Sequence, residues 1–181
     1  PHDTSWLNML SSEITPTLQS YLIEFLESRS AKLKVKASYG NSKKKLTELR
    51  RTLREMNVDG LILPRADEHQ GEYIPPGSER LAWLTGFDGS AGFAIILQNI
   101  AAVFTDGRYT LQIRQQVDHN CFGIEHVIEN PPIKWLEQNI VSGNRIGFDP
   151  WLHTADAIRQ FEKLINEKGG KLVALNSNPV D

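Results

Sequence analysis

Two apolar runs joined by a short polar turn form the most regular hydrophobic pattern of the chain. The runs cover Gly92 to Leu97 and Ala101 to Thr105, and the turn centres on residues 98–99. This arrangement is typical of a β-hairpin. Glycine-containing loops flank the pair, Thr85 to Gly92 in front and Asp106 to Tyr109 behind. Because the two strands are antiparallel, both loops are expected at the same edge of the sheet.

Apolar residues at helical spacing precede the hairpin in two places. The periodicity predicts amphipathic helices over Thr17 to Arg29 and over Lys43 to Asn57, with Asn57 as the C-terminal cap of the second. The stretch between them is small and basic, as linkers often are. We therefore assign residues 1–42 to an N-terminal extension with one amphipathic helix and a linker, and residues 43–181 to a domain.

Strands and helices alternate through the rest of the chain. Asp106 is positioned to cap the helix that follows the hairpin. An antiparallel hairpin combined with such alternation predicts an α/β domain, a mixed sheet flanked by helices. The pattern predicts strands at Leu61 to Pro64, Gly123 to Val127, Arg145 to Phe148 and Leu172 to Leu175, and helices at Ser78 to Trp83, Arg108 to Val117, Pro132 to Ile140 and Thr154 to Lys168.

Composition narrows the classes of partner. Of the 181 residues, 40% are hydrophobic and 23% are charged, with a formal net charge of −2. This near-neutral balance gives no electrostatic reason to expect nucleic acid or an anionic membrane as a partner. The single cysteine, Cys121, cannot form an internal disulfide, which fits a reducing compartment. The first residues lack a signal-peptide pattern and an initiator methionine, which favours a fragment.

A long polar loop follows the first predicted strand of the domain and contains possible metal ligands. A metal site needs several ligands at firm spacing, and the other histidines are scattered along the chain. A hydrogen-bonded loop is therefore the favoured interpretation. The possible ligands are Asp67, Glu68, His69 and Glu72.

The glycine loop at Thr85 to Gly92 does not match known catalytic or phosphate-binding motifs. It precedes a strand, whereas phosphate-binding glycine loops and nucleophile elbows precede a helix, so Ser90 is expected to be a turn hydroxyl. A two-magnesium nuclease would need carboxylates on its first strand. Leu61 to Leu63 offers none, and Asp106 alone cannot make that site.

Arg108 is a candidate of a different kind. A guanidinium just after a strand can present several donors to a carboxylate or a peptide carbonyl. The alternative is an ion pair with Asp106 or Asp88 that only braces the loops. The neighbouring aromatic residues Trp83, Phe87 and Tyr73 could line a cleft or lie in the core. Composition favours the core for all three.

Four segments of the domain together resemble a known family. They are Leu63 to Pro75, Leu84 to Gly92, Thr105 to Tyr109 and Gly147 to Pro150. In this order and spacing they resemble the N-terminal domain of Xaa-Pro aminopeptidases (aminopeptidase P), in the large three-domain form and of bacterial type. The resemblance covers Lys43 to Asp181.

The resemblance implies a creatinase/prolidase-type N-terminal domain with a ribonuclease H-like α/β fold. In the family, a catalytic domain that carries two manganese ions comes later in the chain. None of its metal-ligand motifs occurs here, so we expect no catalytic residue, no metal or cofactor site and no hydrolysis from these residues alone. The implied partners are peptides with proline at the second position, the other domains of the same chain and a second subunit in a homodimer. The implied location is the cytoplasm.

The resemblance also assigns roles to individual residues. It makes Arg108 a peptide contact, and it places His69, Trp83 and Asp88 as residues that line a catalytic cleft. The leading hypothesis is a substrate-gating domain of a metal-dependent aminopeptidase. The alternatives are a free-standing peptide-binding module without catalysis, or a subunit-contact module that uses the helix near Leu18 to Leu26.

Overall fold

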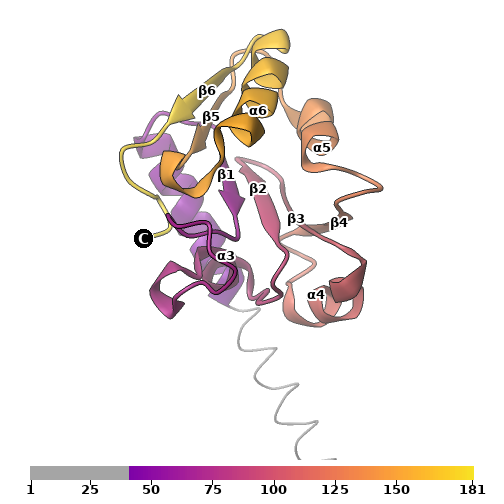
Figure 1. Ribbon diagram of the computed structural model, residues 1–181. Helices are drawn as coiled ribbons and strands as arrows, with labels where there is room; N and C mark the ends of the chain where they lie inside the picture. The colour runs from indigo at the N-terminus through magenta and orange to yellow at the C-terminus, as the bar shows by residue number, and fades with distance from the viewer. Residues whose placement is uncertain (1–40) are drawn as a thin grey trace, which may run out of the picture. The chain divides into compact units, whose positions relative to one another are not determined.

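A six-stranded mixed sheet organises residues 41–181, which are the residues that the computed structural model describes (Figure 1). The strands lie in the order β4-β3-β2-β1-β5-β6. β2 is antiparallel to both neighbours and the other pairs are parallel, so the five remaining strands run in one direction. The strands are β1 (Gly60–Pro64), β2 (Phe93–Leu97), β3 (Ala101–Thr105), β4 (Gly123–His126), β5 (Arg145–Phe148) and β6 (Lys171–Ala174).

Helices cover both faces of the sheet, as the sequence predicts. None of the helices within residues 41–181 combines the length and the apolar character that a membrane crossing requires. The α-helices are residues 41–55, α3 (Arg80–Thr85), α4 (Thr110–Gln116), α5 (Pro132–Asn139) and α6 (Ala155–Glu167), and the 3-10 helices are η1 (Pro76–Ser78), η2 (Gly107–Tyr109) and η3 (Pro150–Leu152).

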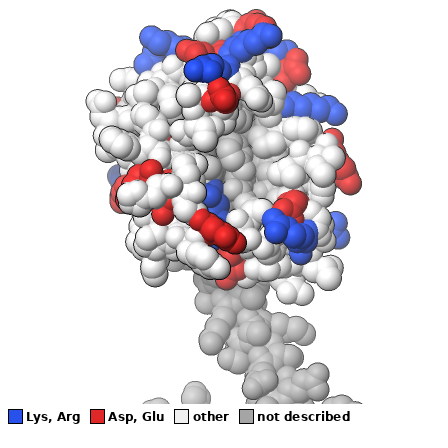
Figure 2. All heavy atoms as spheres, in the orientation of Figure 1, with Lys and Arg blue, Asp and Glu red and all other residues white. Residues whose placement is uncertain are grey.

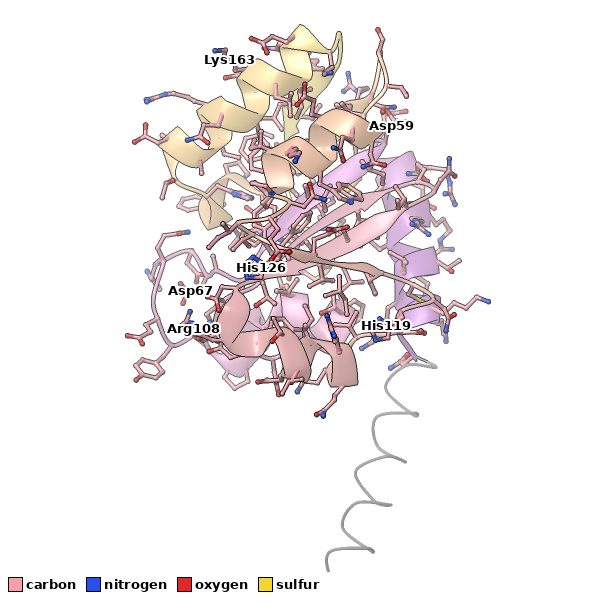
Figure 3. The ribbon with its side chains drawn as sticks, turned by 90° about the vertical axis from the view of Figure 1, so that its right-hand side faces the viewer. Asp59, Asp67, Arg108, His119, His126 and Lys163 are labelled. Carbon is pink, nitrogen blue, oxygen red and sulfur yellow. The ribbon has the colours of Figure 1, made fainter. Side chains whose placement is uncertain are left out.

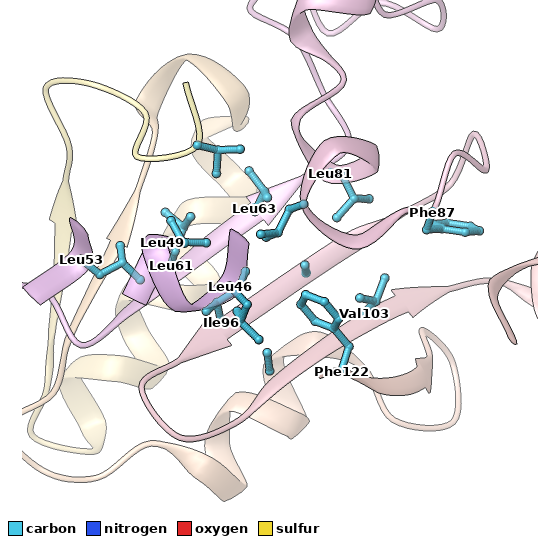
Figure 4. Packing of buried hydrophobic residues seen from close by; sticks show 14 of the residues in the cluster. Leu46, Leu49, Leu53, Leu61, Leu63, Leu81, Phe87, Ile96, Val103 and Phe122 are labelled. Atoms are coloured by element: carbon cyan, nitrogen blue, oxygen red, sulfur yellow. The ribbon is translucent and has the colours of Figure 1, made fainter. Parts of the chain in front are cut away.

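The alternation of side chains along the strands divides the core into two layers. Leu61 and Leu63 of β1 point to one face and Ile62 points to the other. On the first face, helix 41–55 packs through Leu46, Leu49 and Leu53, together with α3 and α4 (Figure 4). On the second face, α5 and α6 pack through five large apolar side chains: Trp135, Leu136, Phe161, Leu164 and Ile165.

Local capping explains why helix 41–55 stops near the residue that the sequence predicts. Asn57 has a left-handed φ of 55°, and the amides of Asn57 and Val58 donate to the carbonyls of Arg54 and Leu53 at 3.0 and 2.9 Å. This is the hydrogen-bond pattern of a Schellman motif, so the predicted cap is confirmed. The predicted elements within residues 41–181 all occur, with boundaries that differ by no more than two residues.

The N-terminal part of the prediction lies outside the described residues. The helix predicted at Thr17 to Arg29 falls there. The described residues belong to one compact unit, Ser38–Asp181. The division into residues 1–42 and 43–181 stays a prediction.

The half-buried imidazole of His153 is expected to make the stability of the domain depend on pH. Its ring lies edge-on to Phe93 and Phe148, with ring centres 6.5 and 5.8 Å away, and its Nε2 atom has no hydrogen-bond partner among residues 41–181. Burial lowers the pKa of His153, although the backbone of Ile62 and the charge of Asp149 act in the opposite direction. The folded domain therefore holds this side chain in its neutral form at neutral pH.

We expect the free energy of unfolding to fall as the pH drops below about 6.5, the ordinary pKa of histidine. In that range the unfolded chain binds a proton that the folded chain resists, and the loss is complete once the pH lies below the lowered pKa of His153. Urea unfolding across this range, compared between the wild type and His153→Gln, measures the effect. The variant is expected to have the shallower pH dependence, and equal slopes would show that His153 does not cause it.

Candidate functional site

The predicted hairpin brings its two flanking loops to one edge of the sheet. Phe93 at the start of β2 pairs with Phe104 near the end of β3, and the Leu97 amide donates to the Ile100 carbonyl at 2.8 Å across the turn. The strands β1, β3, β4, β5 and β6 all end at this edge, which we call the carboxyl edge. Figure 3 shows Asp67, Arg108 and His126 together here, with Asp59 and His119 on the other side.

The same type of turn recurs along the carboxyl edge. In each case a side chain accepts a hydrogen bond from the amide of the residue two positions later, which is the geometry of an Asx turn. After β4, His126 Nδ1 takes the place of the carboxylate and accepts from the Ile128 amide at 3.3 Å. After β1, β3 and β5, the acceptors are Asp67 for His69 (3.1 Å), Asp106 for Arg108 (3.0 Å) and Asp149 for Trp151 (3.0 Å).

These turns present their third residue to solvent. The side chains of His69 and Arg108 are 82% and 67% exposed, and Ile128 and Trp151 are 78% and 75% exposed. The backbone and the acceptor form the turn, so the third side chain is available for contacts outside the domain. The predicted capping role of Asp106 is confirmed, since it begins η2.

Asp106 holds the guanidinium of Arg108 in place. Arg108 Nε lies 3.1 Å from both carboxylate oxygens, and Nη2 lies 2.7 Å from Oδ2. The hydrogen bonds from Arg108 keep the pKa of the Asp106 carboxyl below its usual range, so both groups are charged at neutral pH. Of the two ion pairs considered from the sequence, the structure forms the one with Asp106. This pairing uses Nε and Nη2, which leaves the donors of Nη1 for another acceptor.

Asp88 anchors the glycine loop to α4. Its Oδ1 accepts hydrogen bonds from the side chains of Gln112 and Gln116, both at 2.7 Å. Nearby, the rings of Phe87 and Tyr109 meet edge-on at 5.9 Å, and the hydroxyls of Ser90 and Tyr109 are hydrogen-bonded. The hydroxyl of Ser90 thus joins the glycine loop to the turn after β3. The structure brings the loop of Asp88 and the turn of Arg108 together.

Trp83 makes its contacts elsewhere. It lies in α3, and Lys45 Nζ is 4.5 Å from the centre of its ring and 2.6 Å from its carbonyl oxygen. A cavity of about 400 Å³ beside it is lined by helix 41–55 and by Pro179, Val180 and Asp181. The partners of Trp83 are therefore helix 41–55 and the end of the chain, and the structure does not join it to the turn of Arg108.

The loop after β1 is held by hydrogen bonds around Asp67. Its carboxylate accepts from the amides of His69 and Gly71 at 3.1 and 3.0 Å, and these bonds, led by that of Gly71, lower the pKa of Asp67. The hydrogen-bonded interpretation of this loop is thus confirmed for Asp67. Within residues 41–181, no three His, Cys, Asp or Glu side chains are arranged to hold a metal ion.

Two features of the carboxyl edge escape the reasoning from sequence. Arg65 forms a largely buried ion pair with Glu79, with Nη2 2.9 Å from Oε1, and its amide donates to the Gly92 carbonyl at 3.0 Å. Trp151 is exposed directly after the motif Gly147 to Pro150. The sequence signal for Trp151 is a large apolar residue two positions after an aspartate that directly follows a strand.

Among the three aromatic residues expected in the core, only one is there. Phe87 is fully buried, which confirms the prediction for that residue. Tyr73 and Trp83 are exposed, so the core assignment is wrong for them. The reason is that composition records how often a residue type is buried, whereas these two lie outside the layers that the strands and helices enclose.

The charged side chains on the face seen in Figure 2 carry both signs. Lys and Arg alternate with Asp and Glu, and neither sign forms one large patch there. This face of the molecule therefore offers no large surface of a single charge sign.

A protein-family comparison identifies the fold. The model of the creatinase/prolidase N-terminal domain matches residues 45–177. The chain belongs to the creatinase/prolidase N-terminal domain family. The domain is 38% identical over 141 residues to human Xaa-Pro aminopeptidase 2. This alignment covers 78% of this chain and 21% of the relative. The domain is 40% identical over 139 residues to a probable Xaa-Pro aminopeptidase P of Pyrenophora teres, which covers 76% of this chain and 21% of the relative.

Solved structures agree with this assignment. An X-prolyl aminopeptidase from Caenorhabditis elegans, described as a cytosolic enzyme with a di-nuclear active site, matches with a TM-score of 0.71 and 30% identity over 77% of this chain and 25% of its own. The N-terminal domain of the peptidase PepQ from Mycobacterium tuberculosis matches in fold, with a TM-score of 0.57 and 21% identity over 76% of this chain and 95% of its own.

The comparisons confirm the resemblance that the four motifs indicate, namely the N-terminal domain of Xaa-Pro aminopeptidases. The motifs also suggest a bacterial type, whereas the human and Pyrenophora relatives are eukaryotic. The creatinase/prolidase-type domain spans about one fifth of the length of these curated relatives.

Proposed function

We propose that this creatinase/prolidase-type domain is the substrate-gating domain of a metal-dependent Xaa-Pro aminopeptidase, which removes the N-terminal residue that precedes proline. The single observation that supports the gating role best is the exposed guanidinium of Arg108, fixed by Asp106 at the carboxyl edge. In open α/β sheets, ligands bind beyond the carboxyl ends of the strands. The family membership supplies the reaction class.

The hydrolysis is assigned to another part of the longer protein. There, two divalent ions, which we take to be manganese, would supply a metal-activated hydroxide. The donor set of residues 41–181 does not suit a metal ion, since no three ligand side chains are grouped in that part of the chain. This domain would therefore bind and orient the peptide, and we expect it to be inactive alone.

The proposed ligand is the main chain of a peptide with proline at its second position. Arg108 would donate charge-assisted hydrogen bonds to a peptide carbonyl or carboxylate, with the donors that Asp106 leaves free. His69 and Asp88 lie on loops of the same edge, and we propose that they line the cleft. Trp83 lies beside helix 41–55 and the end of the chain, so it would line a cleft only if the cleft extended to that surface.

The wider setting is proposed from the relatives. We propose a cytoplasmic enzyme, as described for the Caenorhabditis elegans relative. We also propose that the domain contacts the remaining domains of its own chain and a second subunit in a homodimer.

A peptidase assay of the full-length protein tests the proposed function. Peptides of the form Xaa-Pro-Ala are expected to lose their first residue in the presence of manganese, and a chelator is expected to stop the reaction. Matched Xaa-Ala-Ala peptides are expected to be poor substrates. Cleavage that ignores either the metal or the proline would contradict the proposal. Peptide binding without any turnover would instead support the non-catalytic peptide-binding module.

A further inference from the structure

Trp151 is an exposed tryptophan whose backbone amide, and not its ring, takes part in the turn after β5. It lies in η3, directly after β5, and is 75% exposed. The turn is held by Asp149, whose Oδ1 accepts from the Trp151 amide at 3.0 Å, and whose Oδ2 accepts from Asn178 at 2.9 Å. The indole ring is therefore not needed to form the turn. Tryptophan is one of the residue types most often found at the energetic centre of binding interfaces.

The topology places Trp151 at the switch point of the sheet. The chain adds β2, β3 and β4 on one side of β1 and then returns to place β5 on the other side. The gap between the loops after β1 and β5 is where ligands bind in folds of this type. A cavity of about 350 Å³ lies there, and its lining includes Glu68 from the loop after β1 and Trp151 from the turn after β5.

Arg108 and Trp151 follow strands that end at the same edge of the sheet, so strand spacing gives an estimate of how far apart their turns lie. Arg108 follows β3 and Trp151 follows β5, with β2 and β1 between them. Three strand-to-strand steps of about 4.8 Å separate the two turns by about 14 Å. An extended peptide rises about 3.3 Å per residue, so about four residues bridge this distance.

From these observations we infer that Trp151 is a second peptide-contact residue, which takes an apolar ring of the substrate about four residues away from the contact with Arg108. This inference rests on the proposed function, because it assumes that a peptide lies along the carboxyl edge. The flat face of the indole suits a proline ring or an aromatic side chain. The site would make the enzyme prefer longer peptides and would leave tripeptides unaffected.

The test compares Trp151→Ala, Trp151→Phe and the control Val141→Ala in the full-length protein. Val141 is an exposed apolar residue near the start of β5, at the opposite edge of the sheet. For an Xaa-Pro peptide of about eight residues with a second proline near its C-terminus, Trp151→Ala is expected to raise KM about three- to tenfold with kcat unchanged, the effect of one lost aromatic contact. Trp151→Phe is expected to restore most of the affinity. KM for Xaa-Pro-Ala is expected to stay at the wild-type value.

Each other outcome overturns the inference. Equal effects on long and short peptides would place Trp151 near the scissile bond. An unchanged KM for long peptides, or a change in subunit association, would make it a contact to another domain or copy. If Arg108→Ala weakens peptide handling and Trp151→Ala does not, the inference fails while the proposed function stands. If neither variant changes peptide handling, the gating role fails as well.

Discussion

Replacing Arg108 by alanine in the full-length protein is expected to lower kcat/KM for Xaa-Pro peptides by at least about tenfold, the factor for one lost charge-assisted hydrogen bond. The guanidinium is exposed and oriented by Asp106, so its removal takes away peptide donors without opening the core. Steady-state kinetics on tripeptides and longer peptides measure the effect. The fold is expected to persist, because the side chain of Arg108 is largely exposed to solvent.

Two further variants separate peptide binding from loop bracing. Asp106→Asn keeps an oxygen for the Arg108 amide but removes the charge that fixes the guanidinium, so a smaller loss in kcat/KM is expected. Arg159→Ala is a matched control, because Arg159 forms an equally short ion pair with Asp156 at 2.7 Å on the exposed surface of α6. Wild-type kinetics in Arg108→Ala, or an equal loss in Arg159→Ala, would refute the role of Arg108.

Replacing Phe87 by alanine is expected to reduce the free energy of unfolding by about 3–5 kcal/mol, the usual cost of removing a buried phenylalanine. The ring is fully buried in the core layer that faces helix 41–55, and it meets Tyr109 edge-on at 5.9 Å. A side chain at Gly89 or Gly92 would collide with or crowd this ring, which shows how closely the loop packs around it. The loss therefore combines a cavity with a loosened glycine loop.

Urea unfolding of Phe87→Ala and Tyr73→Ala measures this contribution. Tyr73 is an exposed aromatic residue of the same region of sequence, and its removal is expected to change the free energy of unfolding by no more than about 0.5 kcal/mol. Similar losses in both variants would mean that the burial of Phe87 does not account for the effect.

The fold could be predicted because its determinants are local. Alternation along β2 and β3, helical spacing in residues 41–55 and α6, and caps such as Asn57 are each written within a few residues. They also place the loops around Asp88 and Arg108 at one edge, since an antiparallel hairpin leaves no other arrangement.

The partners of the site residues could not be predicted in the same way. The sequence offers Arg108 two possible ion-pair partners, Asp106 and Asp88. The structure shows that the pair forms with Asp106. Trp83 pairs with Lys45, which is 38 residues away in sequence, so no local pattern records that contact. Trp151 has only a weak local signal, and its place between the loops after β1 and β5 follows from the strand order. Long-range geometry decides all three cases.

In the recurring Asx turns at the carboxyl edge, the residues that form the turn are different from the side chains that the turn exposes to solvent. Because carboxylates and main-chain amides build the turns, the residues at 69, 108 and 151 can be exchanged with little cost to the architecture. A substitution at one of these positions is therefore expected to change the surface of the carboxyl edge without changing the turn that carries it.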